Sequence, residues 1–217
     1  MLTNKDRYFI SNIIYPFQEL VQIIYDSRGI LYFDDKYSPL KDKVDHLCTK
    51  ILHVFEQNEF SSEHGISKRN DLNQSDEMYK RILSYAIKVK HGNVTNRHYI
   101  DVDLTLPISV FYIESENTYT TRYTPLLNEH DFITDYHFII KHLIELYDLQ
   151  ITFDMKLHEK IQYVRDNTIF VELQDIFNYK ENGMTESMSI RTLKLVNEEW
   201  IPSDLALNID IKLMKST

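Results

Sequence analysis

The chain has 217 residues, of which 43% are hydrophobic and 26% charged, a balance that is typical of a folded protein and excludes a disordered one. Its formal net charge of −9 argues against nucleic acid as the main ligand. Cys48 is the only cysteine, which excludes an intramolecular disulfide and a cysteine-based zinc cage. Because the first residues are charged and no run of 18 apolar residues follows, we expect a cytoplasmic protein.

Helices are expected to dominate the first third of the chain. Apolar residues recur at steps of three and four through the first segment, which predicts a helix over 5–25. Pro16 lies inside this helix and should kink or split it, because proline has no N–H to donate. After the helix, the short apolar run 30–33 predicts a strand.

The second predicted helix is marked by its start. Ser38 followed by Pro39 is typical of a helix N-terminus, and an apolar stripe then predicts a helix over 39–57. Residues 61–76 are polar and have no period of their own, so we expect a long surface excursion there. Residues 1–76 are therefore expected to form a helical N-terminal region.

The period of the pattern changes to alternation after residue 79. Residues 87–90 and 98–106 alternate between apolar and polar, which predicts a β-hairpin that turns near Gly92. Two further strands are predicted over 108–113 and 118–124.

A helix and more strands complete the expected fold. The pattern predicts a helix over 131–147, a loop over 178–183, and strands over 149–157, 168–174, 187–196 and 205–213. The fold class is therefore predicted as α+β, with N-terminal helices followed by a mostly antiparallel sheet on which one helix packs. Residues 77–217 are expected to form this antiparallel, β-rich domain.

Two aspartates offer a candidate metal site. Asp101 and Asp103 stand two apart on a predicted strand, so both point to one side and can share Mg²⁺ ions, with Asp154 as a third ligand. This pair resembles the carboxylates of the nucleotidyltransferase fold. The alternative, which we favour, is an ordinary set of cross-strand ion pairs, with Asp101 beside Lys90 and Asp103 beside Lys88.

Charges of opposite sign gather in two stretches. Residues 80–98 carry five basic and no acidic residues, namely Lys80, Arg81, Lys88, Lys90 and Arg97. Residues 111–150 have a net charge of −5, and their candidate interface residues are Glu114, Glu116, Glu129, Asp131 and Asp135. Such patches predict head-to-tail association into a ring, in which the basic hairpin of one subunit meets the acidic helix of the next. The alternative is a solvated charged face without a partner.

The last third of the chain carries a family resemblance. The strands 168–174 and 187–196, followed by a turn with Trp200 and Pro202, resemble the closing strands of tail-terminator proteins of tailed bacteriophages. The helix over 131–147 is similar in placement to the helix that packs on their sheet. The resemblance covers roughly residues 131–213.

The resemblance implies a non-enzymatic structural protein of the virion, located in the tail or neck after assembly in the host cytoplasm. It implies a homo-oligomeric ring, as a tail terminator, head-tail connector or baseplate component, that contacts other tail or neck proteins. No cofactor and no membrane are implied, and nucleic acid would only pass through the channel of the ring. Trp200 is then either a core side chain, which we favour, or an interface anchor.

Two other functions stay open at this point. The first is a metal-dependent nucleotidyltransferase-like enzyme that uses Asp101, Asp103 and Asp154. The second is an intracellular protein-binding module of the immunity or antitoxin type, which fits the acidic charge of the chain.

Overall fold

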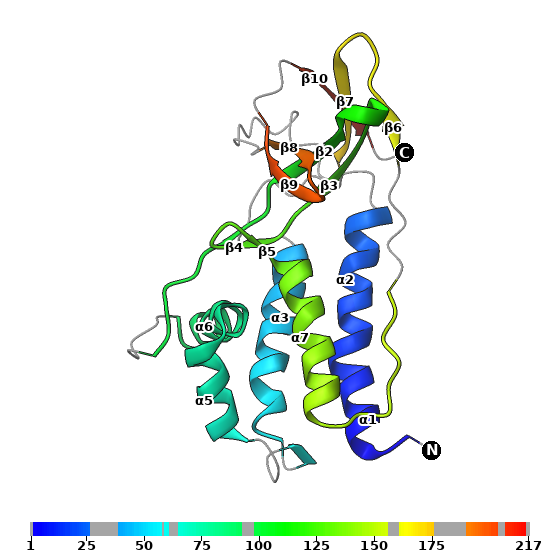
Figure 1. The fold of residues 1–217 in the computed structure, drawn as a ribbon. Helices are drawn as coiled ribbons and strands as arrows, with labels where there is room; N and C mark the ends of the chain where they lie inside the picture. Colours follow the sequence, from blue (N-terminus) through cyan, green and yellow to red (C-terminus); the bar gives the residue numbers. More distant parts are fainter. Residues whose placement is uncertain are drawn as a thin grey trace. The chain divides into compact units, whose positions relative to one another are not determined.

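A computed structural model describes residues 2–26, 39–57, 59–60, 65–92, 98–155, 161–175, 190–203 and 207–215. The chain forms two compact units and passes between them more than once. Unit 1 comprises Met1–Val21, Pro39–Thr105 and Pro125–Met155, and unit 2 comprises Gln22–Ser38, Leu106–Thr124 and Lys156–Thr217. Figure 1 shows that long helices build unit 1 and that most strands lie in unit 2, so the chain has an α+β fold. This division differs from the one expected at residue 76.

The first helical segment continues through its proline. It consists of α1 (Asn4–Phe9), a π-helical turn (Ile10–Ile14) and α2 (Tyr15–Asp26). Pro16 cannot donate to the carbonyl of Asn12, and the wider turn absorbs this loss, with the Tyr15 N–H reaching the Ile10 carbonyl. The predicted helix is confirmed, and its proline produces a π turn where a kink or split was expected. The strand predicted over 30–33 lies outside the described residues.

Two helices follow in unit 1, and one of them was not expected. Helix α3 (Pro39–Val54) confirms the helix predicted from residue 39, although it ends at Val54 and not at residue 57. Helix α5 (Ile66–Ser75) corrects the polar excursion expected over 61–76. Only Leu72 and Asn73 of α5 are buried, so the sequence of this helix has no apolar stripe to reveal it.

Helix α6 (Glu77–His91) replaces the predicted hairpin. The Asp76 carboxylate caps its start by accepting hydrogen bonds from two backbone N–H groups, and Gly92 ends it with a φ of 76°. Its buried apolar residues have helical spacing and outweigh the short alternation over 87–90; they are Tyr79, Ile82, Leu83, Tyr85 and Ala86. Of the second predicted strand, only β1 (Leu104–Thr105) forms.

Helix α7 (Phe132–Leu146) confirms the helix predicted in this part of the chain, and Asp131 is its N-cap. It follows a small antiparallel sheet in which β4 (Leu126–Leu127) pairs with both β1 and β5 (His130–Asp131). In the core of unit 1, the ring of Tyr136 on α7 stacks on that of Phe17 on α2, 5.0 Å between centroids. Residues 149–155 alternate in burial as predicted but pair with no described strand, so the strand expected there is wrong over these residues.

One buried ion pair joins α6 to α7. The guanidinium of Arg81 donates to one carboxylate oxygen of Asp135, with distances of 3.0 Å from Nε and 2.6 Å from Nη2. Both residues are at least nine-tenths buried. Burial raises the pKa of Asp135 and the Arg81 guanidinium opposes this rise. Each charge thus depends on the other to stay inside the unit.

Unit 2 is built from two sheets. The five-stranded sheet has the order β6–β3–β2–β8–β9, with β6 (Gln162–Tyr163), β3 (Thr118–Tyr123), β2 (Ile108–Ile113), β8 (Ile190–Val196) and β9 (Glu199–Pro202). The second sheet pairs β7 (Thr168–Asp175) with β10 (Asn208–Lys215). The hydroxyl of Tyr119 on β3 joins the two sheets, because it accepts from the N–H and donates to the carbonyl of Phe170 on β7.

The strands predicted over 108–113, 118–124 and 168–174 are confirmed, as is the described part of those over 187–196 and 205–213. The loop predicted over 178–183 lies outside the described part of the chain. Most pairs are antiparallel, as expected, but β2 with β8 and β7 with β10 are parallel.

The ion pair of unit 1 yields a stability prediction. We expect Asp135→Ala to lower the free energy of unfolding by about 3–5 kcal/mol, because Arg81 would then be buried without a counter-charge. The double variant Arg81→Met/Asp135→Leu should be markedly less destabilised. Urea unfolding followed by circular dichroism measures both. Lys80→Met, which removes an exposed pair with Glu77, is the control and should change stability by less than about 1 kcal/mol. An equally mild effect of Asp135→Ala would contradict the prediction.

The N-terminal cap yields a prediction on pH. Asp6 is 1% exposed, and although burial raises its pKa, hydrogen bonds from Thr3 and from the Gln150 N–H bring the pKa below its ordinary value. The stabilisation by this carboxylate is therefore present above the unfolded pKa of about 4 and is lost as the pH falls through the folded pKa. We expect Asp6→Asn to cost about 1–2 kcal/mol at pH 7 and clearly less at pH 3.

Urea unfolding at several pH values measures this effect. Asp71→Asn, which alters an exposed carboxylate on α5, is the matched control and should cost little at any pH. A loss of stability in Asp6→Asn that does not depend on pH would show that the carboxylate charge is not what stabilises this end of the helix.

Candidate functional site

The basic residues predicted as an interface lie mainly on helix α6 and not on a hairpin. Three of them are paired within unit 1: Lys80 with Glu77, Arg81 with Asp135, and Lys88 with two aspartates. Lys90 is exposed near the end of α6, and Arg97 lies outside the described residues. Because Arg81 is buried in its ion pair, it is not available to a partner, and this part of the predicted basic interface is corrected.

The acidic residues predicted as an interface belong to two different units. Glu114 and Glu116 are exposed in the short helix η2 (Glu114–Glu116) of unit 2. Glu129, Asp131 and Asp135 belong to unit 1, where Asp131 caps α7 and Asp135 is buried against Arg81. These five carboxylates therefore do not arise from one element, and two of them have structural roles.

The candidate metal ligands are bridged by a lysine. The Nζ atom of Lys88 lies 2.9 Å from Asp101 and 2.6 Å from Asp103, and these carboxylates raise the pKa of Lys88. The ion pair predicted between Lys88 and Asp103 is thus confirmed, although a helix supplies the lysine, whereas Asp101 pairs with Lys88 and not with Lys90 as predicted. Asp154 lies in the unpaired segment 149–155. Within the described ranges, no three His, Cys, Asp or Glu residues gather closely enough to hold a metal ion.

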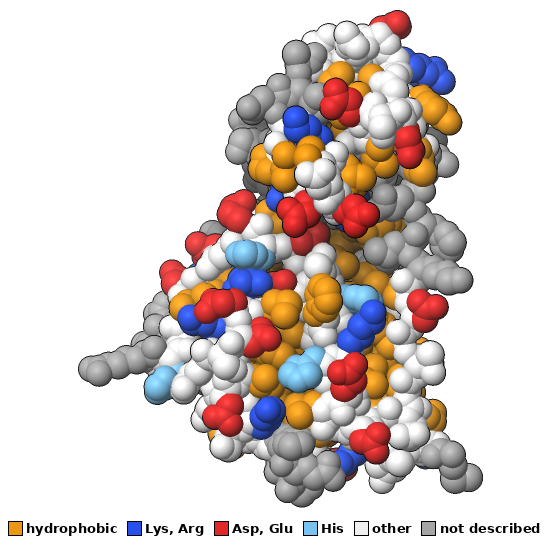
Figure 2. Space-filling view, in the orientation of Figure 1, with side chains coloured by type: hydrophobic (Ala, Val, Ile, Leu, Met, Phe, Trp, Pro, Cys, Tyr) orange, Lys and Arg blue, Asp and Glu red, His pale blue; other side chains and the backbone are white. Residues whose placement is uncertain are grey.

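The β8–β9 hairpin of unit 2 exposes a group of apolar side chains. Leu195, Val196 and Trp200 are each 38% exposed and Ile201 is 36% exposed; we call these four residues the β9 margin. Figure 2 shows hydrophobic side chains gathered over the part of unit 2 where Figure 1 labels β8 and β9. A two-residue turn at 197–198, with φ of 50° and 69°, fixes the hairpin register and so the position of Trp200 opposite Leu195.

Trp200 is packed on one side only, so it is not the buried core side chain that the sequence favoured. Its ring packs edge-on against Phe111 of β2, with centroids 5.1 Å apart, and Phe111 is 4% exposed. On the same face of the sheet, the guanidinium of Arg122 lies over Phe111 at 4.2 Å and over the ring of Tyr25 at 4.6 Å. One side of the tryptophan is therefore held by the sheet, while the other side faces solvent.

The opposite end of the five-stranded sheet also exposes apolar side chains. Tyr163 on β6 is 71% exposed and Ile161 just before it is 61% exposed; we call these two residues the β6 margin. Among the described strands, β6 and β9 are the two ends of this sheet. Sequence analysis identified Trp200 but not the β6 margin. Ile161 and Tyr163 flank a single polar residue, Gln162, and an alternation of three residues is too short to predict a strand.

The lysine bridge yields a prediction on metal binding. We expect Mg²⁺ to leave the melting temperature of the wild type unchanged, because the ammonium of Lys88 already lies between Asp101 and Asp103 and occupies the position of a shared cation. In Lys88→Met the two carboxylates lose that cation, and Mg²⁺ should raise the melting temperature; the further change Asp101→Asn should remove the rise. Differential scanning fluorimetry measures each case. A rise in the wild type that Asp101→Asn abolishes would instead support the metal-dependent enzyme.

Comparisons with known proteins do not place the chain in a family. The chain matches no family model, no curated protein and no solved structure. Among the helices that the structure describes, none has both the length and the apolar character needed to cross a bilayer. The resemblance of residues 131–213 to tail terminators therefore stays a prediction.

Proposed function

We propose that the chain is a non-enzymatic structural protein that assembles into a homo-oligomeric ring, in the tail or neck of a tailed bacteriophage. The observation that carries this proposal is the exposure of apolar side chains at both ends of one sheet, the β9 margin and the β6 margin. The placement in a virion rests on the resemblance of the last third of the chain to tail terminators.

The β9 margin favours association because exposed apolar side chains cluster there on an end strand. Trp200 presents a large aromatic surface whose position is already fixed by Phe111, so little conformational freedom is lost when a partner covers it. Ile201 lies on the other face of the same strand, so both faces of this end of the sheet offer apolar contact. Scattered exposed residues need no partner, but a contiguous group is typical of an interface.

The two ends of the five-stranded sheet expose different residues, and this difference favours a ring over a two-fold dimer. When the β9 margin of one copy contacts the β6 margin of the next, each subunit uses one surface of each kind, and the repeated contact forms a ring when the rotation between subunits closes.

The alternatives have less support from particular residues. The metal-dependent enzyme needs Asp101 and Asp103 as ligands, and both are engaged by Lys88. The protein-binding module of the immunity or antitoxin type would use the same exposed apolar residues, but with a different protein as partner. The ring and the binding module therefore differ in their partner: the ring needs the chain to associate with copies of itself, and the binding module needs a different protein.

Solution mass from light scattering, measured over a range of protein concentrations, tests the proposal. We expect the wild type to form an oligomer of ring size. Ile201→Lys and Tyr163→Lys should each give monomers, because Ile201→Lys places a charge in the β9 margin and Tyr163→Lys places one in the β6 margin. A mixture of the two variants should give dimers and nothing larger, since one intact β9 margin and one intact β6 margin remain. Phe138→Lys, at a 54% exposed phenylalanine of unit 1, is the matched control and should leave the mass unchanged.

Other outcomes separate the alternatives. If Tyr163→Lys has no effect while Ile201→Lys gives monomers, the contact joins two β9 margins and the ring is wrong. A wild type that stays monomeric at every concentration would overturn self-assembly and favour the binding module. A mass that falls as salt rises would show that charged side chains contribute to the contact.

A further inference from the structure

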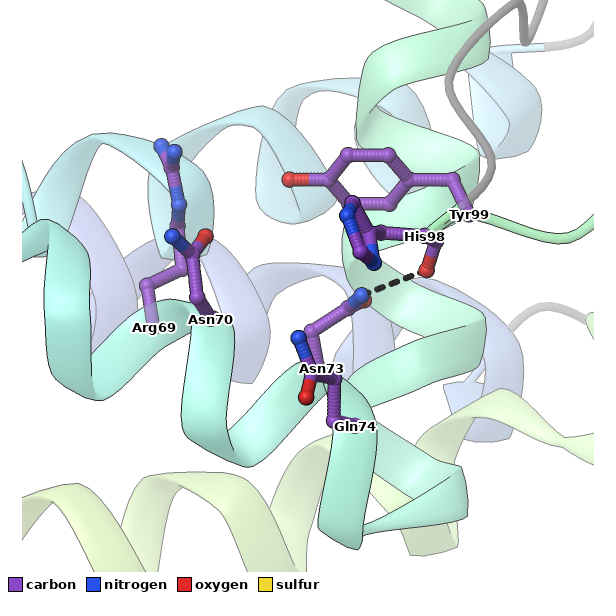
Figure 3. A pocket seen from close by; sticks show the side chains of 6 residues that line it. All are labelled: Arg69, Asn70, Asn73, Gln74, His98 and Tyr99. Carbon is purple, nitrogen blue, oxygen red and sulfur yellow. Dashed lines mark hydrogen bonds between the residues drawn. The ribbon is translucent and has the colours of Figure 1, made fainter.

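Two features of the described residues play no part in the proposed ring: a polar pocket in unit 1 and the outer edge of strand β10 in unit 2. The pocket opens beside helix α5. Figure 3 shows that Asn73 of this helix reaches the chain after α6, where its Nδ2 donates to the backbone carbonyl of His98 at 2.7 Å. The Oδ1 of Asn73 and the Nε of Arg69 have no partner among the described residues, but both atoms are buried and are not presented to the opening. The pocket therefore gives no indication of a ligand.

Strand β10 is an edge strand whose outer side is open. Among the described strands it pairs only with β7, in parallel, and residues 208–212 are all exposed. The Asn208 N–H donates to the carbonyl of Asn167 at 2.9 Å, so the backbone groups of Asn208 and of every second residue after it point towards β7. The N–H and C=O groups of Ile209 and Ile211 therefore point away from β7, where an added strand can bind them.

The side chains at this edge belong to an apolar layer that is open on one side. Ile209 and Ile211 lie in register with Ile169 and Val171 of β7, so these four residues share one face of the sheet. The two β7 residues are 0% and 1% exposed, whereas Ile209 is 37% and Ile211 is 40% exposed. A strand that is added beside β10, with apolar residues at alternate positions, would extend this layer and cover its open side.

The charged residues of β10 indicate that a second β10 is the strand that fits. Asp210 and Lys212 are exposed on the other face of the sheet. When two copies of β10 run antiparallel about Ile211, each Asp210 lies directly opposite Lys212 of the other copy. Sliding the strands by two residues sets either Asp210 opposite Asp210 or Lys212 opposite Lys212, and like charges in that position are destabilising. A slide by one residue would mismatch the outward-pointing backbone groups. The sequence of β10 thus favours one antiparallel register with itself.

We propose that β10 pairs with β10 of a second copy of the chain, antiparallel and centred on Ile211, so that the two-stranded sheets of both copies join. Ile211 then exchanges backbone hydrogen bonds with Ile211 of the second copy. Charges on an edge strand usually discourage such pairing, but here they are of opposite sign and face each other across the contact.

The contact is small and independent of the ring. One strand buries much less surface than the roughly 1,200 Å² of a stable interface, so single subunits pair only transiently. Variants whose ring contact is blocked are therefore still expected to have the mass of monomers in light scattering. Because the contact uses neither the β9 margin nor the β6 margin, it does not rest on the proposed function.

Disulfide trapping tests the pairing and its register. In Ile211→Cys the two introduced thiols face each other, with Cα atoms about 5.5 Å apart, which suits a disulfide. In Ile209→Cys, the matched control at a similarly exposed position, they are about 13 Å apart along the strands. Under mild oxidation with copper phenanthroline, Ile211→Cys should give a covalent dimer on a non-reducing gel and Ile209→Cys at least about tenfold less. The wild type should give none, because its one cysteine, Cys48, is buried.

Charge variants test the reason for this register. In the Ile211→Cys protein, Asp210→Lys should lower the dimer yield several-fold, because it sets a lysine opposite Lys212 of the second copy. A lysine next to a thiol makes the thiol more reactive, so slower oxidation would not explain this loss. Adding Lys212→Asp restores opposite charges and should restore the yield.

Several outcomes would overturn the pairing of β10. These are no dimer from Ile211→Cys, equal yields from Ile211→Cys and Ile209→Cys, or a loss in Asp210→Lys that Lys212→Asp does not restore. Adding Ile201→Lys, which blocks the ring contact, should leave the Ile211→Cys dimer in place; a dimer that disappears would show that the ring alone brings the thiols together. A wild type that is monomeric in light scattering, while Ile211→Cys still forms its dimer, would overturn the ring and support the pairing of β10.

Discussion

The pairing of two buried charges constrains how the helices of unit 1 pack. Arg81 and Asp135 leave water together, and neither charge is tolerated there without the other. The register of α6 against α7 must therefore bring their side chains to hydrogen-bond distance, 2.6 Å at the closest. The next residue of α7, Tyr136, contacts the other helices: its ring stacks on Phe17 of α2, and its hydroxyl donates to the carbonyl of Leu47 on α3.

The pairing of charges also determines which charged side chains of unit 1 remain available to a partner. In unit 1, Lys88 and Arg81 are neutralised by carboxylates of the same unit, so few of the predicted interface charges face solvent unpaired. Two buried polar atoms of this unit, Oδ1 of Asn73 and Nε of Arg69, have no partner among the described residues. In unit 2, exposed apolar side chains lie at the two ends of the five-stranded sheet and also on β7 and β10, at Phe170, Ile209 and Ile211.

A helix or strand was predicted correctly where the pattern of apolar residues in the sequence matches the residues that are buried in the structure. Helix α7 was predictable because Asp131 caps it and its apolar stripe faces the core of unit 1. Helix α5 was not, because it buries only Leu72 and Asn73 and so carries no stripe. The alternation over 87–90 favoured a strand, yet it is the last part of α6, whose earlier residues have helical spacing. A short pattern can fit both periods, and only the longer context separates them.

The sequence by itself determined the α+β class and the longer strands of unit 2, because these depend on periodicity along the chain; the pair of Lys88 with Asp103 was expected from a hairpin, yet a helix brings the two residues together. Only the tertiary structure decided that Arg81 pairs with Asp135, 54 residues away in the sequence. The same holds for the parallel pairing of β2 with β8 and for the pocket between α5 and residues 98–99. Contacts between distant segments depend on how whole elements pack, and no local pattern of side chains specifies that packing.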